Sequence, residues 1–157
     1  MLIAALALSL LIQDPREAAI DCAQALTTLD MNGCAAADLD AAEQRMQTYF
    51  ERVLLKVGED AEGPEAAAAI RAELVMAQKA WQAYIEADCG AVYTYWQSGT
   101  IRVVMALGCK LNLTQERTRH LWRSYLQPMD DSEPLLPEPL PIPSVMAAPA
   151  DEQAAQG

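Results

Sequence analysis

The sequence predicts an all-α fold: a small bundle of three to five helices, stapled by two disulfides and followed by a disordered, proline-rich C-terminal tail. Apolar residues recur at helical spacing over long stretches, and no β-hairpin signal interrupts them. The chain has 157 residues but only one phenylalanine and three tryptophans, so one modest core is expected. A core with so few large side chains usually needs covalent cross-links, which four cysteines can supply.

We interpret residues 1–13 as a signal peptide for export. The run from Leu2 to Ile12 is apolar apart from Ser9, too short to span a bilayer and suited to the apolar region of a signal. No basic residue precedes it, and a short buried N-terminal helix is the alternative. No other segment predicts a membrane span.

The helical domain is expected over residues 14–127 and should open with a short helix over 14–28. Asn32-Gly33 predicts a break after it. A stripe of apolar residues at spacings of three, four and seven predicts a second helix over about 35–57. The stripe consists of Leu39, Met46, Phe50, Val53 and Val57.

A third, long helix should follow an acidic exposed loop over residues 58–63. Pro64 suits the first position of that helix, because its fixed φ fits a helix start and its missing N–H would be unpaired there. The apolar stripe continues through the helix, with Trp81 expected in the core. Its members are Ile70, Leu74, Ala77, Trp81, Tyr84 and Val92.

The pattern breaks again at residues 98–100. Residues 101–108 are apolar and ambiguous between helix and strand, and we interpret them as helical. Thr114 has the features of an N-cap for a last helix ending near Leu126. Residues 128–157 form an acidic tail rich in proline and alanine, with six prolines in 134–149, and should be disordered or extended.

The net charge is −11, from 11 basic and 22 acidic residues. Nucleic acid is an unsuitable partner, because its phosphate backbone attracts positive charge. A basic protein would be attracted, although the tail alone holds six acidic residues and no base.

The four cysteines, Cys22, Cys34, Cys89 and Cys109, favour two disulfides in a small exported chain. They allow three connectivities, of which we favour the local pairing, Cys22–Cys34 and Cys89–Cys109. The alternatives are buried reduced thiols and a zinc site. Zinc sites prefer closely spaced cysteine pairs, which this sequence lacks.

Three segments together resemble the LprI-like lysozyme inhibitor family. Residues 78–89, QKAWQAYIEADC, are similar to the family's Q-x-x-W-x-x-[YF]-R-D-x-x-C, and residues 43–50 are similar to its D-x-x-L-N-x-x-Y. Residues 109–117 resemble its C-x-x-x-[LM]-T-x-x-R, and Cys22 and Cys34 stand where the family has its first two cysteines. The resemblance covers about residues 20–127. It implies a helical exported domain that binds and inhibits a basic lysozyme-type muramidase.

The chain departs from the family pattern at several positions. Ile85 replaces the arginine after the aromatic residue, Glu86 replaces the aspartate, and residues 97–100 replace a Gly-Gly-Ser loop. The Leu-Asn pair has become Met46-Gln47. These changes make the resemblance a firmer guide to the fold than to the activity.

The residues give little support to an enzyme, and we expect no cofactor and no metal. His120 is the only histidine and lies inside the predicted last helix, with no nucleophile indicated beside it. Glu86 and Asp88 lie two apart on a helix and face different directions, so they make no glycosidase pair. We expect Arg117 to pair with one of these two carboxylates across the fold.

The sequence therefore predicts a binding module of the periplasm or the secreted fraction. Candidate partner-binding residues are the acidic Asp60 and Glu62 and the aromatic Tyr95 and Trp96. The alternative is a structural envelope protein whose proline-rich tail recruits a partner. An undetected hydrolase is a third hypothesis.

Overall fold

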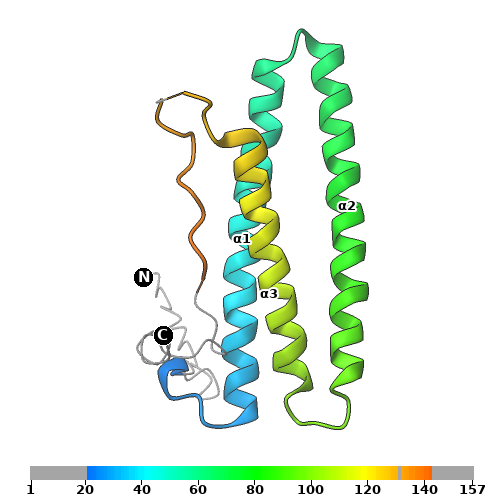
Figure 1. Cartoon of the computed structure of the whole chain (residues 1–157), viewed down its shortest axis with the longest axis vertical. Coiled ribbons are helices and arrows are strands. Elements are labelled where there is room, and N and C mark those ends of the chain that lie inside the picture. Colours follow the sequence, from blue (N-terminus) through cyan, green and yellow to red (C-terminus); the bar gives the residue numbers. More distant parts are fainter. Residues whose placement is uncertain (1–20, 131, 143–157) are drawn as a thin grey trace, which may run out of the picture.

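The computed structural model describes residues 21–130 and 132–142. Within them the fold is all-α, as predicted, with three long antiparallel helices side by side (Figure 1). Apart from a short 3-10 turn and a π-helical turn that continues the last helix, the rest is turns and extended chain. The elements are η1 Cys22–Gln24, α1 Thr28–Asp60, α2 Pro64–Tyr95, α3 Arg102–Leu121 and η2 Trp122–Leu126.

Helix α1 begins earlier than predicted and runs through Asn32-Gly33 without interruption, so the predicted break was wrong. A capping box fixes its start: the Thr27 hydroxyl accepts from the Asp30 N–H, and the Asp30 carboxylate accepts from the Thr27 N–H. Cys34 is buried one position later. This cap and burial outweigh the cost of about 1 kcal/mol for a glycine inside a helix.

The segment before α1 holds only the three-residue turn η1 where the end of a helix over 14–28 was predicted. Residues 14–20 of that prediction, and the whole predicted signal peptide, lie outside the described residues. Between α1 and α2 the predicted loop is shorter than expected, because α1 continues to Asp60. Gly63, with φ 125°, makes the turn that only glycine adopts readily, and Pro64 opens α2 as predicted.

Both predicted disulfides are present. Cys22 is bonded to Cys34 and Cys89 to Cys109, with Cα–Cα distances of 5.6 Å in each case. The first ties η1 to the first turns of α1, and the second ties the end of α2 to α3. Disulfides persist in oxidising compartments, so this pair indicates a protein that resides outside the reducing cytosol.

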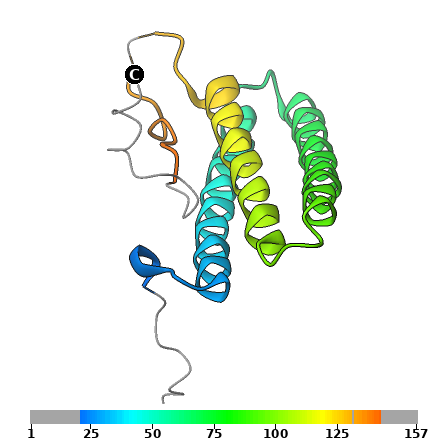
Figure 2. The same cartoon turned by 60° about the horizontal axis from the view of Figure 1, so that its bottom comes forward.

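The main core lies between α1, α3 and η2, and Leu74 of α2 completes it. Val53 and Leu121 at its centre are wholly buried, and Trp81 packs against its edge, as predicted. The predicted stripe on α2 was wrong for Ile70, Ala77 and Tyr84, which are exposed. Only one narrow row of α2 is buried, because the helix has neighbours on one side only (Figure 2). That row consists of Ala67, Leu74, Gln78, Ile85 and Cys89.

Helix α3 includes the ambiguous segment 101–108 almost entirely, which confirms its helical interpretation. Thr114 is therefore not an N-cap but a wholly buried residue in the middle of α3. The N-cap is Ile101, thirteen residues before Thr114, because apolar residues of the intervening segment such as Val104 and Leu111 are buried in the bundle. Helical structure ends at Leu126, as predicted.

Residues 132–142, which we call the strap, run extended alongside α1 and α3 (orange in Figure 1). Of the two states expected for the tail, this part has the extended one; residues 143–157 lie outside the described residues. Among the described helices, none is both long and apolar enough to cross a membrane.

Candidate partner-binding sites

The four residues predicted to bind a partner lie at opposite ends of α2. Asp60 and Glu62 are at the α1–α2 turn, whereas Tyr95 and Trp96 are at the α2–α3 turn (Figure 1). The 32 residues of α2 span about 48 Å at 1.5 Å per residue. The structure therefore separates one predicted site into two candidate sites.

The acidic end is partly neutralised by its own basic residues. The Lys56 ammonium lies 2.6 Å from the Asp60 carboxylate one helical turn away, and Arg52 lies 4.0 Å from Glu59. Exposed pairs of this kind contribute little stability but reduce the local field. Asp60 is thus already paired, whereas Glu62 forms no ion pair within the described residues.

The opposite end carries an exposed aromatic surface. The rings of Tyr95 and Trp96 form an edge-to-face pair with centroids 5.7 Å apart, and Tyr95 is 81% exposed. The Arg102 guanidinium lies 5.5 Å from the centre of the Tyr93 ring and donates to the Gln97 carbonyl oxygen at 3.0 Å. We call these four side chains, Tyr93, Tyr95, Trp96 and Arg102, the aromatic tip.

The aromatic tip sits on a rigid base. The Cys89–Cys109 disulfide closes the α2–α3 hairpin just behind it. The turn itself is tight, because the Gly99 N–H donates to the Trp96 carbonyl oxygen at 2.8 Å. Rigid, amphipathic side chains lose little conformational entropy when they bind a partner, which makes this end of the molecule a candidate binding surface.

A groove with a volume of about 600 Å³ lies between the three helices at mid-length. It combines an apolar floor, which includes Trp81, with a polar rim. We call it the motif groove, because the three segments that resemble the inhibitor family all contribute to it. Its lining residues are Glu43, Gln44, Met46, Gln47, Trp81, Gln82, Ile85, Glu86 and Lys110.

The motif groove was missed at the sequence level, where its residues were interpreted as core and helix surface. A usable signal was present, since Glu43, Met46 and Gln47 are three to four residues apart and share one helix face, as do Trp81 and Ile85. The sequence could not show that the two faces meet across the bundle.

Two hydrogen bonds of the buried Gln78 side chain link the three helices next to the motif groove. The Gln78 side-chain amide donates to the Met46 sulfur at 3.2 Å and accepts from the Arg117 Nε at 3.0 Å. Burial lowers the pKa of Arg117 below its ordinary value. The prediction that Arg117 pairs with Glu86 or Asp88 was therefore wrong, because the side chain turns inward to Gln78.

Glu86 pairs instead with the Lys110 ammonium, at 2.7 Å, on the rim of the motif groove. Ile85, which replaces an arginine in the family pattern, is only 4% exposed. The substitution has thus placed an apolar side chain in the packed row of α2, where an arginine would have required a polar partner.

The described residues contain no arrangement suited to catalysis. His120 is exposed in a shallow depression with Glu116, Arg119 and Arg123, and no nucleophile is hydrogen-bonded to it. Asp88 lies near the sulfur atoms of Cys89 and Cys109, a grouping that could suggest a metal site. Those sulfur atoms are bonded to each other, so they offer no thiolate ligand.

These features define a small helical domain stapled by two disulfides, with an exposed aromatic surface at one end. The family model described as lysozyme inhibitor LprI matches residues 20–121, so the chain belongs to the LprI lysozyme inhibitor family. An uncharacterized protein from Rhizobium meliloti (strain 1021) is 31% identical over 105 residues, which are 64% of this chain and 76% of that protein. No solved structure matches the chain.

Proposed function

We propose that the protein is an exported, non-enzymatic binding module of the cell envelope that inhibits a lysozyme-type muramidase through its aromatic tip. Membership of the LprI family supports the activity. The aromatic tip is assigned as the binding surface because its tyrosine, tryptophan and arginine side chains are exposed. These residue types dominate the binding energy of protein interfaces.

The shape and charge of the chain agree with this role. The aromatic tip lies at the turn between two helices, at one end of the bundle, where a partner can reach it. The net charge of −11 favours encounter with a basic partner, and raised salt should slow that encounter. The acidic end at Asp60 and Glu62 is a weaker candidate for the main contact, since it offers no aromatic anchor.

The alternatives have less support. The structural role for the tail requires a free proline-rich segment, whereas the described strap contacts α1 and α3 of its own chain. A hydrolase would require a reactive group near His120, and both cysteine pairs are oxidised in the structure. The proposal therefore assigns binding, and not turnover, to this domain.

The test is inhibition of several lysozyme types, followed as the loss of turbidity of bacterial cell walls. The oxidised, signal-free protein should inhibit saturably and near stoichiometry. Replacing Tyr95→Ala and Trp96→Ala together should weaken inhibition at least about tenfold, the usual effect of removing anchor residues. Both side chains are exposed, so the variant should keep its helical content, which circular dichroism can verify.

Two matched controls separate the candidate surfaces. Asp60→Asn with Glu62→Gln alters the opposite end of α2, and Gln47→Ala alters the rim of the motif groove. Each should change inhibition less than about threefold, because neither removes an anchor residue. Strong loss in a control and none in the tip variant would move the binding surface away from the aromatic tip. A wild-type protein that inhibits no lysozyme would overturn the proposed activity.

A further inference from the structure

The strap presents one side to the helices at every third residue. Leu136, Pro139 and Ile142 face inward, whereas most residues between them are exposed. Leu136 packs against the main core cluster, and Ile142 packs beside Leu39, Ala42 and Leu111. A spacing of three is the period of the polyproline II helix, which proline-rich segments adopt readily.

The helices bind the strap through its main chain. The Trp122 Nε1–H donates to the Leu136 carbonyl oxygen at 2.9 Å, and the Tyr49 hydroxyl donates to the Pro137 carbonyl oxygen at 2.7 Å. Both aromatic residues are otherwise part of the buried core. Aromatic side chains that hold an extended peptide are the usual basis of polyproline recognition.

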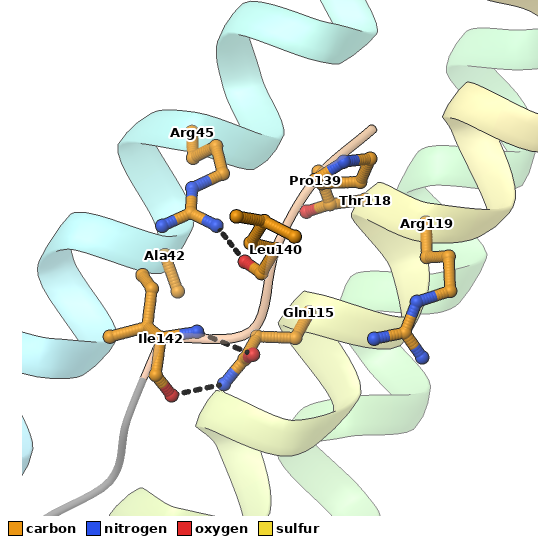
Figure 3. A pocket seen from close by; sticks show the side chains of 8 residues that line it. All are labelled: Ala42, Arg45, Gln115, Thr118, Arg119, Pro139, Leu140 and Ile142. Atoms are coloured by element: carbon orange, nitrogen blue, oxygen red, sulfur yellow. Dashed lines mark hydrogen bonds between the residues drawn. The ribbon is translucent and has the colours of Figure 1, made fainter. Parts of the chain in front are cut away.

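The second half of the strap is held in the same way (Figure 3). Arg45 donates to the Leu140 carbonyl oxygen. The Gln115 side chain forms two hydrogen bonds with the main chain of Ile142. Its Nε2 donates to the Ile142 carbonyl oxygen at 3.3 Å, and its Oε1 accepts from the Ile142 N–H at 2.9 Å. The Leu140 side chain itself is 74% exposed.

These contacts select backbone conformation more than side-chain identity. Within the described residues, five hydrogen bonds from the bundle go to strap carbonyl or N–H groups, and none goes to a strap side chain. Side-chain preference is confined to the three inward positions. A groove of this kind would accept other peptides with an apolar residue, a proline and a second apolar residue spaced by three.

We infer that the groove between α1 and α3, lined by Arg45, Tyr49, Gln115 and Trp122, is a binding site for extended proline-containing peptides. The strap is its occupant within the same chain. A partner segment with the same three-residue spacing is the ligand class that the groove would take in its place. This site is distinct from the aromatic tip, and its test does not depend on lysozyme inhibition.

The attachment of the strap permits such an exchange. The family match ends at residue 121, so the strap lies outside the segment that defines the family. The connection from Leu126 to the strap packs loosely, and an open space of about 470 Å³ separates it from the end of α1. Met129 in this connection is fully exposed. The segment that joins the strap to the last helix therefore leaves the strap room to move away from the groove.

The experiment measures binding of a fluorescent peptide of residues 132–142 to the full oxidised chain and to a strap variant, Leu136→Asp with Ile142→Asp. The variant should release its own strap while keeping every groove residue. It should bind the peptide at least about tenfold more tightly than the wild type, in which the tethered strap competes at high effective concentration. Adding Gln115→Ala should weaken that binding about tenfold, because two hydrogen bonds are lost.

A peptide of the same composition with Pro139 moved by one position is the matched control, and it should bind at least about tenfold more weakly. If the strap variant unfolds, the wild-type chain with a protease site inserted near Met129 replaces it. After cleavage of the folded protein, the labelled peptide should displace the native strap. Failure of the cleaved chain or the folded variant to take up any peptide would overturn the inference, as would equal binding of both peptides.

Discussion

The two sides of the bundle differ in how completely they are covered. The side formed by α1 and α3 contains the main core and is crossed by the strap, whose main-chain groups are held by buried aromatic residues. Helix α2 buries a single row and leaves apolar side chains such as Met76 and Tyr84 exposed. Packing between α1 and α3 therefore contributes most of the stability of the fold, whereas most of α2 is exposed.

Core truncations should show the largest difference between the two sides. Leu121→Ala removes a wholly buried side chain from the centre of the α1–α3 core and should lower the free energy of unfolding by about 3–4 kcal/mol. Leu74→Ala, the matched change on α2, should cost about 2 kcal/mol, because α2 can relax toward the cavity. Urea denaturation measures both. Equal losses would show that α2 is as tightly packed as α3.

Removal of the disulfide that ties α2 to α3 should have the next largest effect on stability. Replacing Cys89→Ala and Cys109→Ala opens a loop of 20 residues and should cost about 3 kcal/mol. Because α2 has few other contacts, its amides should also exchange with solvent much faster than those of α1. Hydrogen exchange resolves this effect by helix. Uniform acceleration throughout the bundle would contradict the distinction between the two sides.

Tyr49→Phe removes one strap contact and should cost about 1 kcal/mol. Burial raises the pKa of Tyr49 above its ordinary value near 10, although Arg45 opposes the shift. The protonated hydroxyl is thus favoured in the folded state, so its contribution is complete below about pH 10 and is lost as the pH rises through the folded-state pKa. The difference in melting temperature between wild type and variant should shrink above pH 10. A constant difference up to pH 11 would exclude this linkage.

The smallest effect is expected on the open face of α2. Met76 is 62% exposed, so Met76→Gln should change the free energy of unfolding by less than about 0.5 kcal/mol. Thermal denaturation in dilute solution provides the measurement. A loss above about 1 kcal/mol would mean that this face is covered, for example by association of the chain with itself.

Much of the fold could be predicted from short-range patterns. Pro64 marked the start of α2, and the local pairing that we favoured among three possible connectivities is the one in the structure. The candidate site was predictable only in part. Tyr95 and Trp96 were predicted to be exposed, and they are, but their separation from Asp60 and Glu62 depends on the length of an unbroken α2.

The sequence by itself determined the helical class and the family, because each depends on residue types at fixed spacings along one chain. It favoured two disulfides but allowed three connectivities, and the structure decided between them. The tertiary structure decided that α1 continues through Asn32-Gly33 and that Thr114 lies inside α3. It also decided that the strap binds the bundle, through contacts such as that between Tyr49 and Pro137, 88 residues apart. Burial and hydrogen bonds between distant residues outweigh local propensities of about 1 kcal/mol. Such distant contacts cannot be predicted from a local sequence pattern.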